Sequence, residues 1–352
     1  MYKSKPFVIA GPCSAETEEQ VMTTATQLSL SGNVSVFRAG LWKPRSRPGT
    51  FEGVGNIGLP WLQRVQKELG MQVATEVAKP EHVLEAQKNG IDFIWIGARS
   101  TSSPFVVQEI ADALNGTNLG VLVKNPINPD LELWIGALER IVEAGVKRLA
   151  AVHRGFSYYE KARYRNIPHW QIAIEFKQRL PEVPFFCDPS HISGDASIVS
   201  EVSQKAMDLK YDGLMVETHH TPSEAWSDAG QQITPGQLIT LLENLVVRNT
   251  FSDDHCFLSI LSELRNKIDE IDEQLLEVLE KRMAISETIA RHKKTSKVTI
   301  LQPSRWNEIL QKSITKGRKM GLDPEFVEAI FKAIHNESIM HQSRVMNKER
   351  DV

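Results

Sequence analysis

Cysteine is scarce in this chain of 352 residues, and the three that occur are Cys13, Cys187 and Cys256. Three thiols do not make a framework of paired disulfides, so the sequence is typical of a reducing compartment. An excess of charge is also missing, because the formal net charge is −3 at pH 7. Since proteins that bind nucleic-acid backbones usually carry a basic surplus, we expect no nucleic-acid partner.

Long apolar runs are absent as well. No segment approaches the ~20 apolar residues that cross a bilayer, and residues 1–14 pass directly into a strand-like pattern that leaves no room for a signal peptide. Hydrophobic residues make up 41% of the chain and charged residues 24%, which is ordinary for a soluble globular protein. We therefore expect a cytoplasmic protein that does not enter a membrane.

What the chain does contain, from residue 6 to about 250, is an alternation of short apolar runs with amphipathic helical stretches. The runs that predict strands are 7–14, 34–40, 72–77, 93–100, 120–126, 148–155, 184–191 and 213–220. Eight strands alternating with eight helices predict an α/β fold, a closed (β/α)₈ TIM barrel. A doubly wound open sheet is the alternative, although no Gly-x-Gly-x-x-Gly motif follows the first strand.

After residue 249 the pattern changes. The polar stretch 250–257 reads as a linker, and glycine and proline become rare beyond it. Apolar residues then recur at heptad spacing, which predicts one long helix: Leu261, Leu264, Ile268, Ile271, Leu275, Val278, Ile285 and Ile289. Two further helices are predicted near 303–319 and 324–343. We therefore expect a barrel domain, 1–249, followed by a small all-α helical bundle domain, 258–352.

Charged residues gather at the carboxyl ends of the predicted strands, where TIM barrels hold their catalytic groups. Six of them are cations at or just after a strand end: Arg38, Lys43, Arg45, Arg99, Lys124 and Arg154. Six positive charges on one face repel one another unless an anion lies between them. A surface ion pair would explain any one of them, but their shared position predicts a site for phosphorylated small molecules.

A second group combines a thiol, an imidazole and two carboxylates. Cys13 lies near the end of the first predicted strand, His191 ends the seventh, and Glu217 and Asp228 belong to the last. These donors could surround one divalent ion, and their mixture leaves Mn²⁺, Fe²⁺, Co²⁺ and Zn²⁺ open. Each residue also has a structural explanation, such as Cys13 as a small buried hydrophobe. Spacing alone does not decide between them.

The motifs around these residues resemble those of the 3-deoxy-D-arabino-heptulosonate 7-phosphate (DAHP) synthases, in their short type I, β-subgroup form. In order, across residues 6–248, they are AGPCS, FRAGLWKPRS, IGARS, VLVKNP, AVHRGF, CDPSH and GLMVETHH…SDAGQQIT. The family often has Thr where this chain has Ser46, which keeps the hydroxyl. The similar 3-deoxy-octulosonate 8-phosphate synthases carry a sequence of the KANRS kind where this chain has KPRS, which argues against that activity.

This resemblance implies a metal-dependent condensation of phosphoenolpyruvate (PEP) with erythrose 4-phosphate. It implies that the metal, most readily Mn²⁺, polarises the aldehyde and is held by Cys13, His191, Glu217 and Asp228.

The same resemblance assigns the substrates. It implies that the PEP phosphate binds Arg99, Lys124 and Arg154, with Arg38 and Lys43 near the PEP carboxylate. Erythrose 4-phosphate would bind Arg45 and Ser46. Lys43 would also donate a proton to the developing alkoxide, and Glu76 would orient the water that attacks PEP.

In the predicted long helix, Arg282 falls where the heptad requires an apolar residue. A charge there is costly to bury unpaired, so Arg282 sets the helix register, extends to solvent or binds an anion. Residues 264–282, 289–293 and 337–342 resemble the all-helical, AroQ-type chorismate mutases.

This second resemblance implies a unimolecular rearrangement of chorismate to prephenate. No nucleophile or metal is needed, because catalysis comes from holding the dianion in its reactive shape beside positive charge. The residues on the family's substrate-binding positions are Arg265, Arg282, Lys293, Gln302, Arg305, Ser338 and Gln342. Lys293 and Gln342 would face the breaking ether bond. Gln302 and Trp306 replace acidic residues found in some members, which puts catalytic efficiency in doubt.

Arg265 and Arg282 are 17 positions apart, which is roughly 26 Å along a helix. Two arginines at that distance do not close around one small ligand, so we expect Arg265 to come from a second chain of a homodimer. Two alternatives stay open. The helical domain could bind prephenate or chorismate and inhibit the barrel without useful turnover, or it could chiefly dimerise the chain. Feedback by prephenate is our hypothesis.

Overall fold

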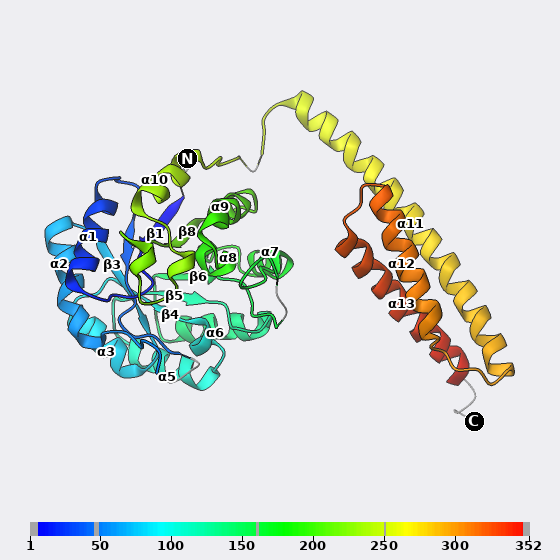
Figure 1. The fold of residues 1–352 in the computed structure, drawn as a ribbon, viewed down its shortest axis with the longest axis horizontal. Helices are drawn as coiled ribbons and strands as arrows, with labels where there is room; N and C mark the ends of the chain where they lie inside the picture. Colours follow the sequence, from blue (N-terminus) through cyan, green and yellow to red (C-terminus); the bar gives the residue numbers. More distant parts are fainter. Residues whose placement is uncertain (1–5, 46–48, 160–161, 250, 348–352) are drawn as a thin grey trace. The chain divides into compact units, whose positions relative to one another are not determined.

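The computed structural model describes residues 6–45, 49–159, 162–249 and 251–347, and the chain falls into two compact units, 1–250 and 251–352. The first unit is built on parallel strands that close into a barrel in sequence order (Figure 1). They are β1 Phe7–Gly11, β2 Val36–Arg38, β3 Gln72–Val77, β4 Phe93–Ile96, β5 Gly120–Lys124, β6 Leu149–His153, β7 Phe185–Cys187 and β8 Gly213–Glu217. The last strand pairs back to the first, from Phe7 with Gly213 to Gly11 with Glu217. The predicted (β/α)₈ barrel is confirmed.

A helix follows each strand and covers the outside of the barrel (Figure 1). The principal helices are α1 Glu18–Ser29, α2 Leu59–Leu69, α3 Pro80–Lys88, α5 Pro104–Leu114, α6 Leu131–Glu143, α7 Trp170–Arg179, α9 Val199–Asp208 and α10 Pro235–Asn244. Side-chain caps fix several starts: Asp130 accepts from the Leu133 amide at the start of α6, and Thr234 with Gln237 forms a capping box on α10.

Alternate residues of each strand face opposite sides, which produces two apolar layers. On β4, Trp95 points into the barrel with Leu122 and Met215, whereas Ile94 and Ile96 pack beneath the helices. The rigid interior leaves the strand ends as the place where polar groups meet.

The predicted strands run too far at their carboxyl ends. Cys13 lies beyond β1, Arg154 directly follows β6, and Arg99 and His191 lie on two short helices, α4 Ala98–Thr101 and α8 Pro189–Ser193. At β7 the reason is local: Asp188 caps α8 by accepting a hydrogen bond from the His191 amide, so the chain turns before His191.

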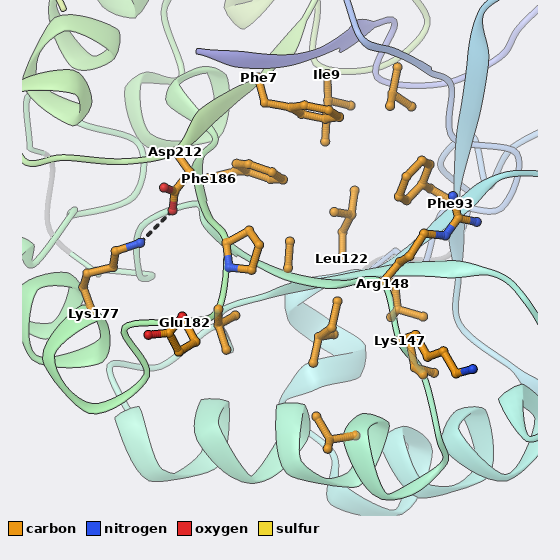
Figure 2. Close-up of a pocket in the computed structure, with 18 of the residues that line it drawn as sticks. Phe7, Ile9, Phe93, Leu122, Lys147, Arg148, Lys177, Glu182, Phe186 and Asp212 are labelled. Carbon is orange, nitrogen blue, oxygen red and sulfur yellow. Dashed lines mark hydrogen bonds and ion pairs between the residues drawn. The ribbon is translucent and has the colours of Figure 1, made fainter. Parts of the chain in front are cut away.

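A cavity of about 730 Å³ opens at the amino end of the barrel (Figure 2). Phe7, Phe93, Leu122 and Phe186 line it, and none of the residues that the sequence assigns to a site contributes to it. Its size exceeds that of the cavity at the opposite end. Because TIM-barrel chemistry is carried by the loops at the carboxyl end, however, the larger cavity is not the candidate active site.

The second unit consists of α11 His255–Thr295, α12 Pro303–Lys319 and α13 Pro324–Asn347. α13 packs against both other helices. A Cβ on Gly317 of α12 would lie 2.6 Å from Val327 of α13, so glycine permits their close approach. The bundle is as predicted, except that α11 begins within the expected linker because the Asp254 carboxylate caps it. Among the residues described above, no helix is both long and apolar enough to cross a membrane.

Candidate active sites

The first candidate site lies at the carboxyl ends of the barrel strands. One cavity there is lined by Lys43, Pro44, Arg45, Glu76, Gly97, Ala98, Arg99, Lys124, Arg154, His191 and Asp228. Most of the barrel residues predicted from the sequence therefore meet in one place. Ser46 lies outside the described residues.

Arg38, at the end of β2, is fully buried and is not among the residues that line this cavity. Its NH2 donates to Glu217 Oε1 at 3.1 Å, and both side chains are 0% exposed. The guanidinium also lies over the Trp95 ring, 4.6 Å from its centroid. Its Nε and NH1 have no hydrogen-bond partner among the described residues. Because buried donors are rarely left unpaired, these two nitrogens fit a site that an anion completes.

Lys43 and Glu76 form a buried ion pair. Lys43 Nζ lies 2.9 Å from Glu76 Oε2 and donates to the Cys13 carbonyl oxygen at 3.1 Å. Burial favours the neutral amine, but the acidic groups Cys13, Glu76 and Glu217 prevail and raise the pKa of Lys43. Burial likewise favours neutral Glu76, yet Lys43 and Lys124 lower its pKa. The pair is therefore ionised at neutral pH.

Gly97 makes room for this carboxylate. A Cβ at position 97 would lie 2.2 Å from Glu76 Oε1, well inside van der Waals contact. The side chain of Glu76 consequently reaches over the end of β4.

Lys124, the last residue of β5, donates to Asp188 Oδ2 at 2.7 Å, and both are buried. Asp188 also lies 2.8 Å from His191 Nδ1. Burial lowers the pKa of His191 more than Asp188 and Glu217 raise it, so the imidazole is neutral and able to bind a metal. Asp188 stands in the CDPSH motif, yet the sequence interpretation assigned only its histidine.

Arg154 and Arg99 complete the cationic side of the cavity. The Arg154 NH1 group donates to Asn166 Oδ1 at 2.6 Å, and its amide donates to Asn125 Oδ1 at 2.7 Å. These contacts fix the side chain at the cavity wall. Burial lowers the pKa of Arg154 to about 10, which leaves it charged at neutral pH. Arg99 reaches the same wall from the first turn of α4.

Three of the four predicted metal ligands form a cluster. One donor atom each of Cys13, Glu217 and Asp228 lies within 4.8 Å of the others. That is close to what two ligand bonds of ~2.0–2.3 Å allow. His191 stands beside it, with Nδ1 3.8 Å from Glu217 Oε1. Burial, followed by Glu217, raises the pKa of Cys13 to about 12. A cation would relieve this crowding of acidic groups, so the residues fit a divalent metal.

Besides Asp188, the sequence interpretation missed Arg165 and Gln231. Arg165, in the segment between β6 and α7, donates to Asp228 Oδ1 at 2.9 Å and to Gln231 Oε1 at 2.6 Å. Gln231 in turn donates to Glu217 Oε2 at 2.7 Å. Both hold the carboxylates of the predicted metal ligands from outside the long helices and strands, where no periodic pattern marks them.

Arg45 lies in the loop that follows β2. It lines the same cavity, and its Nε donates to the Phe51 carbonyl oxygen at 3.0 Å. The three described residues of the KPRS motif, Lys43, Pro44 and Arg45, therefore all line this cavity.

The second candidate site lies in the helical unit. Arg282 of α11 donates to the Ser338 hydroxyl of α13, and one turn along each helix Gln342 Nε2 donates to Ser286 Oγ at 3.2 Å. Ser286, Ser338 and Gln342 are buried, and Gln342 Oε1 has no partner among the described residues. Three of the predicted mutase residues therefore meet around a polar core.

The remaining predicted mutase residues make other contacts or are exposed. Lys293 Nζ donates to the Ile300 carbonyl oxygen at 2.5 Å, and exposed Arg305 pairs with Glu308 at 2.8 Å. Gln302 precedes α12 without a side-chain cap. Arg265 is exposed on α11.

Comparison with known proteins identifies a family for each of the two units. Residues 3–250 match the DAHP synthetase I family, and residues 264–343 match chorismate mutase type II. Phospho-2-dehydro-3-deoxyheptonate aldolase of Thermotoga maritima is 33% identical over 226 residues, 64% of each chain. The match thus spans less than two thirds of that relative. A 2-dehydro-3-deoxyphosphooctonate aldolase of Variovorax paradoxus is 26% identical over 274 residues, covering 72% of this chain and 93% of the relative.

Solved structures agree with the fold. The crystal structure of the Thermotoga maritima DAHP synthase superposes with a TM-score of 0.61 at 30% identity, covering 68% of both chains. A truncated form of the T. maritima enzyme gives 0.58 at 28% identity, covering 68% of this chain and 85% of that one. The chain belongs to the DAHP synthetase I family and carries a chorismate mutase type II domain after the barrel in its sequence.

Proposed function

We propose that the barrel condenses PEP with erythrose 4-phosphate to give DAHP and phosphate. The observation that carries this is the convergence of buried cations on one cavity beside a cluster of metal-ligand side chains. Two phosphorylated substrates need such a concentration of positive charge.

Different residues of the site would bind the two substrates. The PEP phosphate would bind Arg99, Lys124 and Arg154, and the PEP carboxylate would take the unpaired nitrogens of Arg38. Arg45 and Ser46 would bind the phosphate of erythrose 4-phosphate. Charged Lys43 is suited to donate a proton to the developing alkoxide, and ionised Glu76, at 2.9 Å, to orient the attacking water.

Cys13, His191, Glu217 and Asp228 would hold one divalent ion, with Mn²⁺ the expected metal. When bound, the ion acts as a Lewis acid toward the aldehyde oxygen. Arg165 and Gln231 hold two of these carboxylates in place through the hydrogen bonds described above.

The test measures PEP consumption by the purified full chain with Mn²⁺, with and without EDTA. We expect turnover with erythrose 4-phosphate that EDTA abolishes. Arabinose 5-phosphate, the acceptor of the octulosonate synthases, should give far less turnover. Equal or better turnover with arabinose 5-phosphate would reassign the barrel, and no PEP consumption with either acceptor would reject the proposal.

We propose further that the helical unit converts chorismate to prephenate as part of a homodimer. The apolar face of α11 supports this: Leu264, Ile268, Ile271, Leu275 and Val278 are 51–62% exposed, although they follow the spacing of a buried seam. A second copy laid against this face would bury it. It would also bring its own Arg265 to the cluster of Arg282, Ser338 and Gln342.

Prephenate would inhibit the barrel as the product of the fused unit. Adding saturating prephenate to the PEP assay tests this, and an unchanged rate would reject it. The alternative, a helical unit that binds prephenate without useful turnover, draws on Trp306. This residue stands in place of an acidic one and stacks on His335 with centroids 4.0 Å apart. Tight prephenate binding with a negligible mutase rate would favour that alternative.

A further inference from the structure

Glu16 is a buried carboxylate that the proposed reaction does not use. It lies between β1 and α1 and is 6% exposed. Its Oε1 accepts hydrogen bonds from the Trp226 amide at 2.8 Å and from the Ser14 hydroxyl at 3.3 Å. Its Oε2 lies 3.7 Å from Nε2 of His219. A buried carboxylate kept among donors from two distant segments has a positional role.

His219 faces Glu16 with a hydrogen. Its Nδ1 accepts from the Thr221 amide at 2.9 Å, so the neutral ring carries its hydrogen on Nε2. That nitrogen is buried and has no other partner among the described residues. Three donors therefore surround the Glu16 carboxylate.

The segments that Glu16 joins both carry metal-ligand residues. Ser14 follows Cys13, and Trp226 and Ser227 precede Asp228. The Ser14 and Ser227 hydroxyl oxygens are 2.5 Å apart. Gln232 bridges the same segments, accepting from the Cys13 amide at 3.1 Å and donating to the Ser227 carbonyl oxygen at 2.9 Å.

We propose that Glu16 is a positioning residue, which sets the distance between Cys13 and Asp228 and thereby the affinity of the metal site. This inference rests on the proposed metal dependence. Glu16 acts on the chain neighbours of two of these ligands, and the polar groups that support ligands typically change metal affinity 10- to 100-fold.

Trp226 also contacts the loop after β2 that carries Lys43 and Arg45. The Trp226 ring meets Phe51 edge to face, with centroids 5.2 Å apart at 90°. Phe51 accepts from Arg45, and its neighbour Glu52 accepts from the Lys43 amide at 2.8 Å. The Trp226 amide therefore bonds Glu16 beside the proposed metal ligands, whereas the Trp226 ring packs on the loop that carries Lys43 and Arg45.

The test compares Mn²⁺ binding by the metal-free full chain, from the signal of free Mn²⁺ in electron paramagnetic resonance. In Glu16→Gln the new amide group turns its hydrogens toward one of the surrounding donors, which repels it and disturbs the two segments that Glu16 joins. We therefore expect Mn²⁺ affinity to fall 10- to 100-fold. The control is Glu19→Gln, an exposed acid on α1, which should bind like the wild type. Thermal unfolding of the metal-free proteins checks that both variants fold.

Substituting Trp226 separates the effect of its amide on the metal site from the effect of its ring on the loop that carries Lys43 and Arg45. Trp226→Ala keeps the amide, so Mn²⁺ affinity should stay within about twofold, while the KM for erythrose 4-phosphate rises several-fold more than the KM for PEP. Trp226→Phe restores an aromatic edge and should recover most of that KM.

The outcomes distinguish this inference from the proposed function. If the wild type itself binds no Mn²⁺, the metal site is wrong. If the wild type binds Mn²⁺ and folded Glu16→Gln binds it equally well, the role of Glu16 is wrong.

Discussion

Lys43 and Glu76 meet across the mouth of the barrel, with Nζ 2.9 Å from Oε2, although 33 positions separate them in the sequence. Each keeps the other ionised in a place where burial would favour the neutral forms. A proton donor and a carboxylate are thus held ready side by side, and the anchor of Lys43 on the Cys13 carbonyl ties the pair to the metal-ligand segment.

Replacing Lys43 by methionine should lower kcat for DAHP formation by a factor on the order of 10²–10⁴, the usual contribution of a positioned acid or base. Mn²⁺ affinity should change much less, because Lys43 contributes no ligand. Steady-state kinetics and Mn²⁺ titration of the same preparation check both. Lys79→Met, on an exposed residue before α3, is the matched control. A Lys43→Met enzyme within threefold of the wild type would remove Lys43 from the mechanism.

Arg38→Met should destabilise the barrel, because it leaves Glu217 as a fully buried charge without its partner. Breaking such a pair costs about 3–5 kcal/mol. Mn²⁺ should restore part of that loss, since a cation beside Glu217 compensates the charge. Urea unfolding with EDTA and with Mn²⁺ measures both effects, followed by tryptophan fluorescence. Arg64→Met, which breaks the exposed pairs with Glu18 and Glu68, should have a much smaller effect. Equal stability of the Arg38 and Arg64 variants would contradict the argument.

His153 predicts how stability depends on pH. It is fully buried, bonded to the Tyr211 hydroxyl at 2.8 Å, and burial lowers its pKa to about 3. The unfolded chain takes up this proton near pH 6.5 and the folded one does not, so stability falls as pH drops below 6.5. Between pH 7 and pH 5 this residue accounts for about 2 kcal/mol.

The double variant His153→Phe with Tyr211→Phe keeps the aromatic packing and removes the titrating group together with its hydroxyl partner. Its unfolding free energy should therefore decline less between pH 7 and pH 5 than that of the wild type. Urea titrations at the two pH values give the difference. Parallel declines in both proteins would mean that other groups dominate the acid sensitivity.

The exposed seam of α11 predicts that association and mutase activity are lost together. Ile271→Asp combined with Leu275→Asp places charges on the proposed dimer face, so we expect a monomer in sedimentation equilibrium without mutase activity. Glu273→Asp, an acid-for-acid change on the same helix, is the control. A dimeric double variant with full mutase activity would show that this face is not the interface.

The barrel could be predicted because its strands are buried on both sides, and such runs stand out as apolar segments between amphipathic helices. The strand ends could not, because turns and caps decide them: the strand predicted over 184–191 ends at Cys187, where Asp188 caps a short helix. Nor could the contact between Arg165 and Asp228 be foreseen, since it joins two irregular segments. Arg38 was found by its position at a strand end, but its stacking on Trp95 depends on the closed barrel.

Gly97 has a consequence for how this family can vary. The Glu76 carboxylate occupies the space that a side chain at position 97 would need, so we expect the residues at these two positions to vary together. Glycine to alanine adds only a methyl group, yet here that methyl group would press on the Glu76 carboxylate and disturb its pairing with Lys43. Relatives that place a larger residue at position 97 should therefore have a shorter or uncharged residue at position 76, and should lack the proposed orientation of water by this carboxylate.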